Sequence, residues 1–369
     1  MNIVIAGGGT GGHLYPCIAL ANTFIKRENK TKMLFIGTAT GMEAQVVSGH
    51  GFCFAAIRAQ GFVGKPLLGK LRALSFMVAG LFQAIGHLKK FAPDLVIGIG
   101  GYTSGPVMIA AFILRIKRVI LEPNLIPGMM NKVLAPFVHL AVTAFEATRN
   151  DLRARNIACL GAPVRSEILG IQKISKHKVV PSVLILGGSQ GSHSINQAVM
   201  NALPFLKNAT ITVVHQTGTK DYDALLSAYA KYSIHARVFK FIENMAEVYA
   251  EADFVISRAG AMTLAELASV GLPALLIPFP YAKAHQEKNA DIFVSAGAAE
   301  MMLDKDLTGE KIAGQILSFC NNPKKLSVMA EASKKLGHPN AANEIVSACF
   351  SLVRGGGDSI LFQGAAGKG

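Results

Sequence analysis

A glycine-rich segment that follows a short apolar run occurs twice in this chain. Residues 4–13 (VIAGGGTGGH) align with residues 184–193 (LILGGSQGSH), and three glycines and a histidine coincide at a constant offset. A buried strand that leads through a Gly-rich turn into a helix is how a Rossmann-like domain begins. The repeat therefore predicts two such domains, with chance similarity between two strand–turn–helix starts as the alternative.

Short apolar runs without polar interruption recur along the rest of the chain, with helical stretches between them. Such runs are typical of parallel strands that are buried on both faces. Their alternation with helices predicts an α/β protein with doubly wound parallel sheets. The predicted strands are Asn2–Ala6, Lys32–Ile36, Leu95–Ile99, Arg118–Leu121, Leu140–Thr143, Val183–Leu186, Thr210–His215, Val238–Phe241, Phe254–Ser257 and Ala274–Ile277.

The length of 369 residues also suits two domains. We expect an N-terminal domain over 1–162 and a C-terminal domain over 163–339, with a boundary at the Gly-Ala-Pro of 161–163. A last helix at about 340–353 is expected to pack back on the first domain. The basic segment 171–181 is predicted to be a surface loop, and the Gly-rich tail 355–369 to be disordered.

Charge and cysteine content narrow the class of protein. The formal net charge of +14 favours anionic partners, namely nucleic acid, an acidic membrane surface or phosphorylated substrates. No RNA-binding signature, zinc finger or basic recognition helix is present, so nucleic acid is not expected. The five cysteines are scattered and form no C-x-x-C pair, which indicates reduced thiols. No signal peptide precedes the first strand, so we expect a protein that stays in the cytoplasm.

The first Gly-rich turn has the spacing of a dinucleotide fingerprint but lacks its acidic partner, because the second predicted strand ends in Phe-Ile-Gly at 35–37. A phosphate-binding P-loop is excluded because no Lys-Ser or Lys-Thr follows Gly12. The turn still lets the backbone approach a phosphate or a sugar at a helix N-terminus. His13 begins that helix and could act as a base near neutral pH, with packing or capping as the alternative.

The densest motif in the second half is residues 257–266 (SRAGAMTLAE), which pass from a strand end into a helix. Backbone N–H groups of Ala261–Thr263 could hold a diphosphate there. Glu266 could accept hydrogen bonds from ribose hydroxyls, or only balance the helix dipole. Farther along, Gln286 and Asn289 could bind sugar hydroxyls, or be ordinary surface residues. The Asp304-x-Asp306 pair is interpreted as a polar turn and not as a metal site.

A longer apolar stretch, 73–88, has basic residues on both sides but is too short to cross a bilayer. Its helical spacing predicts that one apolar face belongs to the core, namely Leu71, Leu74, Val78, Leu81, Phe82, Ile85 and Leu88. Phe76 and Met77 would then project elsewhere and could dip into an anionic membrane surface, where each nearby Lys or Arg contributes about 1 kcal/mol. An ordinary amphipathic core helix is the alternative.

Seven motifs in this order resemble the MurG family of bacterial peptidoglycan glycosyltransferases. They are GGGTGGH (7–13), GIGGYTSGP (98–106), EPNLIPGMMNK (122–132), GAPVR (161–165), GGSQGS (187–192), SRAGAMTLAE (257–266) and HQEKNA (285–290), and the resemblance covers about residues 1–350. The resemblance implies the GT-B fold, in which two Rossmann-like doubly wound domains face a cleft. It implies inverting transfer of N-acetylglucosamine (GlcNAc) from UDP-GlcNAc to the 4-hydroxyl of undecaprenyl-pyrophosphoryl-muramyl-pentapeptide.

The resemblance also implies a site. His13 would be the general base, with Glu266 and Arg165 as further catalytic residues, and no metal or cofactor is expected. UDP-GlcNAc would lie mainly on the C-terminal domain, and the enzyme would act peripherally at the anionic cytoplasmic face of the inner membrane. The implied substrate contacts are Thr10, Gly11, Gly12, Tyr102, Asn124, Arg165, Ser189, Gln190, Ile242, Ala261, Met262, Thr263, Leu264, Ala265, Glu266 and Gln286.

Two other functions remain open from the sequence. The first is another GT-B enzyme, such as a UDP-GlcNAc 2-epimerase, against which the polar Tyr102 and Ser104 of the GGYTSGP segment argue because they suit an acceptor site. The second is a non-catalytic module that binds nucleic acid or membrane through its positive charge.

Overall fold

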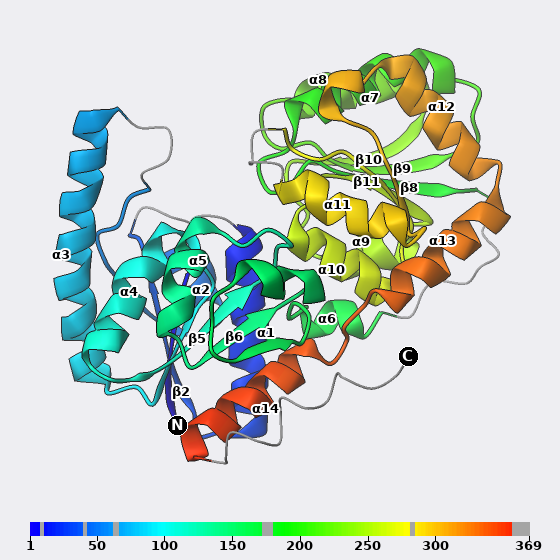
Figure 1. The fold of residues 1–369 in the computed structure, drawn as a ribbon. Coiled ribbons are helices and arrows are strands. Elements are labelled where there is room, and N and C mark those ends of the chain that lie inside the picture. Colours follow the sequence, from blue (N-terminus) through cyan, green and yellow to red (C-terminus); the bar gives the residue numbers. More distant parts are fainter. Residues whose placement is uncertain (8–10, 40–42, 62–65, 172–179, 281–284, 356–369) are drawn as a thin grey trace. The chain divides into compact units, whose positions relative to one another are not determined.

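The computed structural model contains two compact units, and each is described by itself (Figure 1). The first unit joins Met1–Arg165 to the segment that begins at His338, and the second is Ser166–Gly337. The structure describes residues 1–7, 11–39, 43–61, 66–171, 180–280 and 285–355. Most of the predicted loop 171–181 and nearly all of the predicted tail therefore lie outside the described residues.

The first unit is built on a seven-stranded parallel sheet of order β3-β2-β1-β4-β5-β6-β7. The inner strands are almost completely buried, as their unbroken apolar sequences require. Register is regular, with Val4 of β1 opposite Leu34 on one side and Val96 on the other. The strands are β1 (Asn2–Ala6), β2 (Lys32–Gly37), β3 (Cys53–Ala56), β4 (Leu95–Gly98), β5 (Lys117–Glu122), β6 (Leu140–Thr143) and β7 (Ile157–Cys159).

Helices cover both faces of this sheet. One core contains residues of α1, α2 and α14, and the core on the opposite face contains residues of α3, α4 and α5. The helical elements are α1 (Gly11–Arg27), α2 (Glu43–Gly49), α3 (Leu67–Phe91), α4 (Gly101–Ile113), α5 (Met129–Leu134), η1 (Ala135–Phe137), η2 (Glu146–Asp151) and α14 (Ala341–Arg354).

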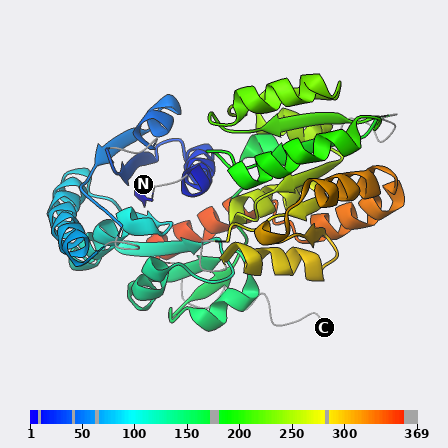
Figure 2. The ribbon, with the colours of Figure 1, turned by 90° about the horizontal axis from the view of Figure 1, so that it is seen from above.

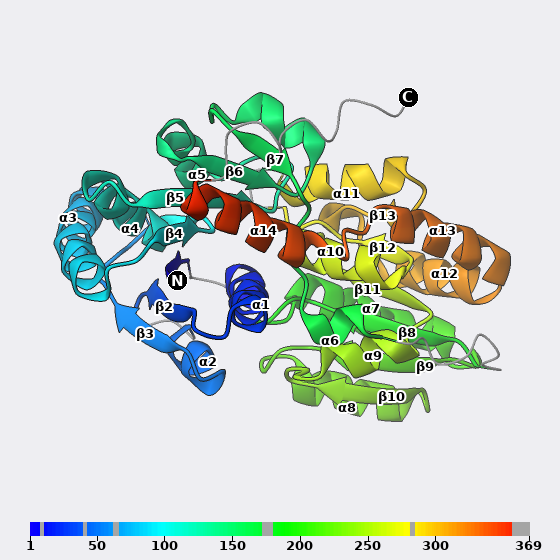
Figure 3. The ribbon, with the colours of Figure 1, turned by 90° about the horizontal axis from the view of Figure 1, so that it is seen from below.

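Helix α14 comes from the far end of the chain yet completes the core of the first unit. Figure 3 shows it alongside α1. Ile345, Val346 and Cys349 are fully buried, and the Phe350 ring lies 5.8 Å from the ring of Phe24 on α1. Arg354 forms an ion pair with Glu28 just after α1. The last helix is therefore an integral layer of the first unit.

Helix α3 packs on α4 through its small residues, which corrects the predicted core face. Ala73 and Ala84 are fully buried, and a side chain at Gly80 would meet the Arg58 carbonyl oxygen at 2.1 Å. Arg58 lies in the segment after β3, and the same side chain at Gly80 would meet Pro106 Cβ on α4 at 3.7 Å. Large side chains therefore do not fit on this face of α3. Helix α3 and its neighbour α4 are seen side by side in Figure 1.

The large apolar residues of α3 consequently point outward. Leu74, Val78 and Phe82 are 46%, 47% and 69% exposed, so their predicted place in the core is wrong. Leu88 is buried as predicted, and Leu81 and Ile85 are partly buried. Phe76 and Met77, predicted to project away from the core, are half-buried, and their contact with a membrane stays a prediction.

The second unit is a six-stranded parallel sheet of order β10-β9-β8-β11-β12-β13. Figure 2, the view from above, shows helices on both sides of its green and yellow strands. Helices α7, α8 and α12 supply most of the core on one face. The strands are β8 (Ser182–Leu186), β9 (Thr212–Gln216), β10 (His235–Phe239), β11 (Phe254–Ser257), β12 (Ala274–Leu276) and β13 (Ala299–Met301). The helical elements are α6 (Ser166–Leu169), α7 (His193–Leu206), α8 (Tyr222–Lys231), α9 (Met245–Glu251), α10 (Ala261–Val270), α11 (His285–Ser295), η3 (Asp304–Asp306), α12 (Gly309–Cys320) and α13 (Pro323–Lys335).

The predicted class of two doubly wound parallel α/β domains is confirmed, and all ten predicted strands are present at least in part. The prediction missed β3, β7 and β13, and it placed β10 three residues too late. All four strands lie at an edge of their sheet.

Candidate functional site

The second Gly-rich turn lies at the carboxyl end of β8 and is locked to a neighbouring loop through its backbone. A Cβ at Gly191 would meet the Thr217 carbonyl oxygen at 2.0 Å, and one at Gly218 would meet the Gln190 carbonyl oxygen at 2.2 Å. Both glycines have positive φ. This crossing of two loops leaves Ser189 and Gln190, both predicted substrate contacts, exposed at the edge of the sheet.

Helix α10 begins at Ala261, as the SRAGAMTLAE motif predicts. Its N-cap is Gly260, which provides no side-chain hydrogen bond to the first turn. A ten-residue helix with an uncapped N-terminus directs backbone N–H groups and partial positive charge outward, which suits a phosphate. The backbone of Ala261, Met262 and Thr263 forms that first turn, and Leu264 lies in the core with 0% exposure.

Glu266 lies in the second turn of α10 and is 9% exposed. The Tyr249 hydroxyl, on α9, donates a hydrogen bond to its Oε2 atom at 3.0 Å. This contact sets the direction of the carboxylate, which the sequence assigned to ribose binding. Tyr249 itself was not predicted, because a tyrosine in a short helical segment gives no signal of such a role.

Gln216, at the end of β9, fixes two neighbouring loops of the second unit. Its Nε2 atom donates to the Gly188 carbonyl at 2.8 Å, and its Oε1 atom accepts from the Ile242 amide at 2.8 Å. The side chain of Ile242, a predicted donor contact, is buried at 5% exposure. Gln216 therefore aligns the Gly-rich turn with the loop that follows β10.

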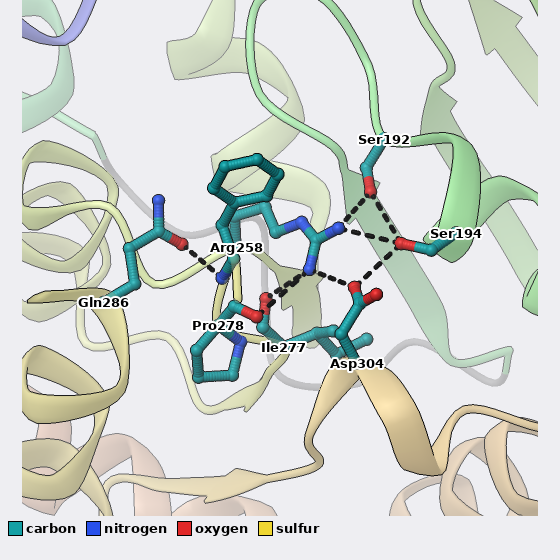
Figure 4. A network of polar contacts seen from close by, with 8 residues as sticks. Ser192, Ser194, Arg258, Ile277, Pro278, Gln286 and Asp304 are labelled. Carbon is teal, nitrogen blue, oxygen red and sulfur yellow. Dashed lines mark hydrogen bonds and ion pairs between the residues drawn. The ribbon is translucent and has the colours of Figure 1, made fainter. Parts of the chain in front are cut away.

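Arg258 connects four loops at the carboxyl edge of the second sheet (Figure 4). Its Nη2 atom donates to the Ser192 and Ser194 hydroxyls at 2.7 and 2.8 Å. Its Nη1 atom donates to the carbonyls of residues 277 and 278 at 3.1 and 3.2 Å and also to the Asp304 carboxylate. The Arg258 side chain is 11% exposed, so this is a largely buried ion pair with all its acceptors supplied by the protein.

Gln286, a predicted sugar contact, stands at the start of α11. Its Oε1 atom accepts a hydrogen bond from the Phe279 amide at 2.9 Å. The ring of Phe279 also lies under the Arg258 guanidinium, 5.4 Å from its centre. Asn289, one turn farther along α11, is fully buried, and its Nδ2 atom donates to the Ala259 carbonyl at 3.5 Å, so its interpretation as a sugar-binding residue gives way to a packing role.

In the first unit, Glu122 organises the loop that carries Asn124. This carboxylate is 2% exposed at the end of β5. Its Oε1 atom accepts from the backbone and side-chain nitrogens of Asn124 at 3.0 and 3.1 Å. Its Oε2 atom accepts from the Gly128 amide and the Asn131 side chain at 2.8 and 2.9 Å. Four hydrogen bonds to one carboxylate hold the loop rigid, and the side chain of Asn124 is directed by it.

The GGYTSGP segment forms the start of α4 next to β4. Its N-cap is Gly100, which together with Gly101 has positive φ and lacks a side-chain cap. Tyr102 is half-buried. The hydroxyls of Thr103 and Ser104 are buried without a hydrogen-bond partner in the described part of the chain. Tyr102 is therefore the side chain of this segment that a ligand could contact, because those of Thr103 and Ser104 are fully buried.

Arg165 belongs to the first unit, where its guanidinium lies over the ring of Tyr15, 4.6 Å from the ring centre. Tyr15 is on α1, two residues after His13, so Arg165 reaches the helix that follows the first Gly-rich turn. Thr10 lies outside the described residues. The backbone of Gly11, Gly12 and His13 forms the first turn of α1.

The described residues hold no cluster of three or more His, Cys, Asp and Glu side chains that could bind a metal ion. The acidic pair at 304–306 forms the short turn η3, and its first carboxylate is engaged by Arg258 and by Ser194. None of the five cysteines forms a disulfide bond. Burial raises the pKa of Cys17, and it raises the pKa of Cys349 to about 12, so these thiols stay protonated and are poor nucleophiles.

The comparisons with known proteins agree with this geometry. The model of the glycosyltransferase family 28 N-terminal domain matches residues 3–143, and that of the family 28 C-terminal domain matches residues 182–345. The chain belongs to glycosyltransferase family 28. The family 28 assignment removes the non-catalytic binding module from the functions that the sequence left open.

Curated relatives in family 28 extend over nearly the whole chain. A protein of Syntrophus aciditrophicus is 40% identical over 96% of this chain and 99% of its own length. One from Anaeromyxobacter sp. (strain Fw109-5) is 42% identical over 96% of this chain and 94% of its own length. Both are named UDP-N-acetylglucosamine–N-acetylmuramyl-(pentapeptide) pyrophosphoryl-undecaprenol N-acetylglucosamine transferase.

Solved structures confirm the GT-B fold class. MurG of Acinetobacter baumannii aligns with a TM-score of 0.75 and 28% identity over 94% of this chain and 98% of its own. The UDP-GlcNAc 2-epimerase of Neisseria meningitidis aligns with a TM-score of 0.68 over 95% of this chain and all of its own, but at 15% identity, which shows a shared fold alone.

Proposed function

We propose that this chain catalyses the inverting transfer of GlcNAc from UDP-GlcNAc to the 4-hydroxyl of undecaprenyl-pyrophosphoryl-muramyl-pentapeptide, a step of peptidoglycan synthesis. The observation that carries the proposal is identity of about 40% to transferases of this name over 96% of the chain. The motifs at 98–106, 187–192 and 257–266 each lead from the end of a strand to the start of a helix.

In this proposal UDP-GlcNAc binds at the carboxyl edge of the second sheet. The uncapped start of α10 holds the diphosphate, and Glu266, aligned by Tyr249, accepts hydrogen bonds from the ribose. Ser189, Gln190 and the segment around Ile242 contribute further contacts. Gln286 binds the hydroxyls of the sugar.

The acceptor is assigned to the first unit, along the start of α4 with Tyr102, whereas Asn124 is assigned to the donor. His13 takes the proton of the attacking hydroxyl, with Thr10, Gly11 and Gly12 as the turn that approaches the donor. A positioned general base contributes about 10²–10⁴ in rate. Arg165 and the N–H groups of α10 stabilise the charge that develops on departing UDP, a role for which the planar guanidinium is suited. No residue of this scheme requires a metal.

We also propose peripheral attachment to an anionic membrane, at the cytoplasmic face of the inner membrane. No helix in the described part of the chain is long and apolar enough to cross a bilayer. The first unit does expose large apolar side chains on three helical elements that lie together, α3, α4 and η1. They are Leu74, Val78, Phe82, Ile109, Phe112, Ile113 and Phe137. Lys89 and Lys90 in the last turn of α3 supply positive charge close to this apolar face.

The test is release of UDP from UDP-GlcNAc by the full chain, with and without the lipid-linked muramyl-pentapeptide, in the presence of EDTA. Release that depends on the acceptor and survives EDTA is expected. Release without acceptor would instead indicate an epimerase or hydrolase. Loss of release in EDTA, restored by Mg²⁺, would contradict the metal-independent scheme.

A further inference from the structure

Asp304 is the one residue of the Asp-x-Asp pair that takes part in the Arg258 network. Its Oδ1 atom accepts from the Ser194 hydroxyl at 2.8 Å and forms an ion pair with Arg258. Its side chain is 21% exposed, whereas Asp306 at the other end of the same turn is exposed. Two acidic residues of one turn therefore occupy different environments, and only the first faces the loops of the candidate donor site.

The network extends from Asp304 to a residue assigned to the sugar. Arg258 donates to the carbonyls of Ile277 and Pro278, the residues that lead β12 into its loop. The next amide, that of Phe279, donates to Gln286 Oε1. Figure 4 shows these groups in sequence, from Asp304 through the guanidinium to the Gln286 amide.

This arrangement decides which end of the Gln286 amide is presented to a ligand. A backbone N–H can only donate, so the group that faces it must be the carbonyl oxygen of the side chain. The Nε2 atom must then point away from the loop, and Figure 4 shows it directed away from the hydrogen bond that the Gln286 oxygen accepts. Gln286 thus offers hydrogen-bond donors, which fit the oxygen atoms of a sugar.

We propose that Asp304 is a positioning residue for the sugar part of the donor, acting through Arg258 and the 277–279 backbone on the amide of Gln286. The inference rests on the proposed function. Asp304 fixes the guanidinium plane by an ion pair, and the guanidinium in turn holds two consecutive carbonyls. Without the carboxylate, Arg258 keeps its serine and carbonyl acceptors but loses the charged group that sets its direction.

The experiment compares the full chain with Asp304→Asn and, as the matched control, Asp306→Asn. Dissociation constants of UDP and of UDP-GlcNAc are measured by calorimetry, together with KM for UDP-GlcNAc and kcat. Because Gln286 is assigned to the sugar and not to UDP, Asp304→Asn should weaken the binding of UDP-GlcNAc about tenfold more than the binding of UDP. KM should rise by a similar factor while kcat stays within about threefold, and Asp306→Asn should resemble the parent chain.

Asp304→Glu is the second variant, since it restores the carboxylate on a longer side chain. It should recover part of the preference for UDP-GlcNAc, provided that thermal unfolding shows all variants to be folded. Equal weakening of UDP and UDP-GlcNAc, or an unchanged ratio of the two constants, would overturn the positioning role. If the parent chain binds UDP-GlcNAc and turns it over, but Asp304→Asn leaves the ratio of the two dissociation constants unchanged, only the positioning role of Asp304 is contradicted. A parent chain that fails to bind UDP-GlcNAc contradicts the proposed function as well.

Discussion

The two units share a strand order and differ in how their exposed apolar side chains are distributed. Both sheets run outward from the first strand of the unit in the same pattern, β3-β2-β1-β4-β5 in one and β10-β9-β8-β11-β12 in the other. The first unit exposes large apolar residues on α3, α4, α5 and η1. The second unit exposes large apolar residues too, such as Phe205 on α7 and Val328 on α13, but they are spread over separate elements. Both units bury polar groups, such as Glu122 in the first and His215 in the second.

This difference indicates that the functions of the two units are determined by their loops and outer helices and not by their sheets. A parallel sheet with helices on both faces needs buried apolar strands, and both units have them. The exposed apolar helices suit contact with a lipid surface, whereas buried ion pairs and hydrogen-bonded networks suit rigid loops around a polar ligand. The predictions below test this division from the largest expected effect to the smallest.

The two histidines that coincide in the Gly-rich repeat should differ most. His13→Ala should lower kcat about 10²–10⁴-fold, because the attacking hydroxyl loses its base. His193→Ala should change kcat by less than about threefold, since His193 is an exposed residue whose ring pairs with Asp221. Steady-state turnover of both folded variants decides the matter, and near-normal turnover by His13→Ala would remove His13 from the mechanism.

Membrane attachment should depend on the apolar face of the first unit alone. Phe82→Glu should weaken binding to vesicles of anionic phospholipid about 10–100-fold, because one large apolar side chain is withdrawn from the bilayer and a negative charge is added. Phe205→Glu is the control, since Phe205 is 57% exposed on α7 of the second unit. Co-sedimentation with the vesicles measures both. An equal loss of vesicle binding in the two variants would show that membrane attachment does not depend on the apolar face of the first unit alone.

The buried histidine of the second unit should make that unit sensitive to acid. His215 Nδ1 accepts from the Tyr229 hydroxyl at 3.0 Å, and its Nε2–H donates to Asn196 Oδ1 at 3.1 Å. Burial lowers the pKa of His215 to about 3. The unfolded chain, with a pKa of about 6.5, binds the proton more readily. The contribution of neutral His215 to the free energy of unfolding is therefore fully present above pH ~6.5. It is lost as the pH falls toward ~3, by about 1.4 kcal/mol per pH unit.

Native-state hydrogen exchange of amides in β8 and β9, followed from pH 7 to pH 4, measures this loss. His215→Asn should flatten the dependence on pH even though it destabilises the unit at neutral pH. His235→Asn, at an exposed position of β10, should leave the slope unchanged. An unchanged slope in His215→Asn would assign the acid sensitivity to other groups.

The smallest effect concerns two glycines of α3. A side chain at Gly86 would meet nothing within 4 Å, so Gly86→Ala should stabilise the first unit by about 0.5–1 kcal/mol through helix propensity. Gly80→Ala should have the opposite sign, because its new methyl group would collide with the Arg58 carbonyl. Chemical denaturation gives both values. Stabilisation by Gly80→Ala would show that α3 does not pack closely on the backbone at Arg58.

The interior of each sheet could be predicted from the sequence, and its edges could not. Inner strands such as β4 and β11 are covered on both faces, so their sequences are continuous apolar runs. The edge strands β3 and β10 have no fully buried position, and the edge strand β13 has only three residues. Such strands depend on pairing with a neighbour, which a local pattern does not reveal.

The same limit explains what was missed in the site and on α3. Helix starts such as that of α10 are visible in glycines and small residues, whereas Arg258 and Tyr249 act through partners farther away in the sequence. Glu122 has its partners within nine residues, but a single acidic residue at a strand end gives no signal of such a network. On α3, apolar periodicity suggested that the largest side chains are buried. The close approach to α4 instead selected Ala73 and Ala84 for the interface. Spacing identifies the faces of a helix, but the neighbour decides which face it covers.

The return of α14 to the first unit has a consequence for the order in which the chain can fold on the ribosome. The second unit is continuous, Ser166–Gly337, so all of its own contacts are available once Gly337 has emerged. The first unit, although most of it is synthesised earlier, lacks the layer formed by Ile345, Val346 and Cys349 until this last helix has emerged. Nascent chains that stop before Ala341 would therefore present the uncovered apolar face of α1 to chaperones, and the later-made unit is the one able to finish first.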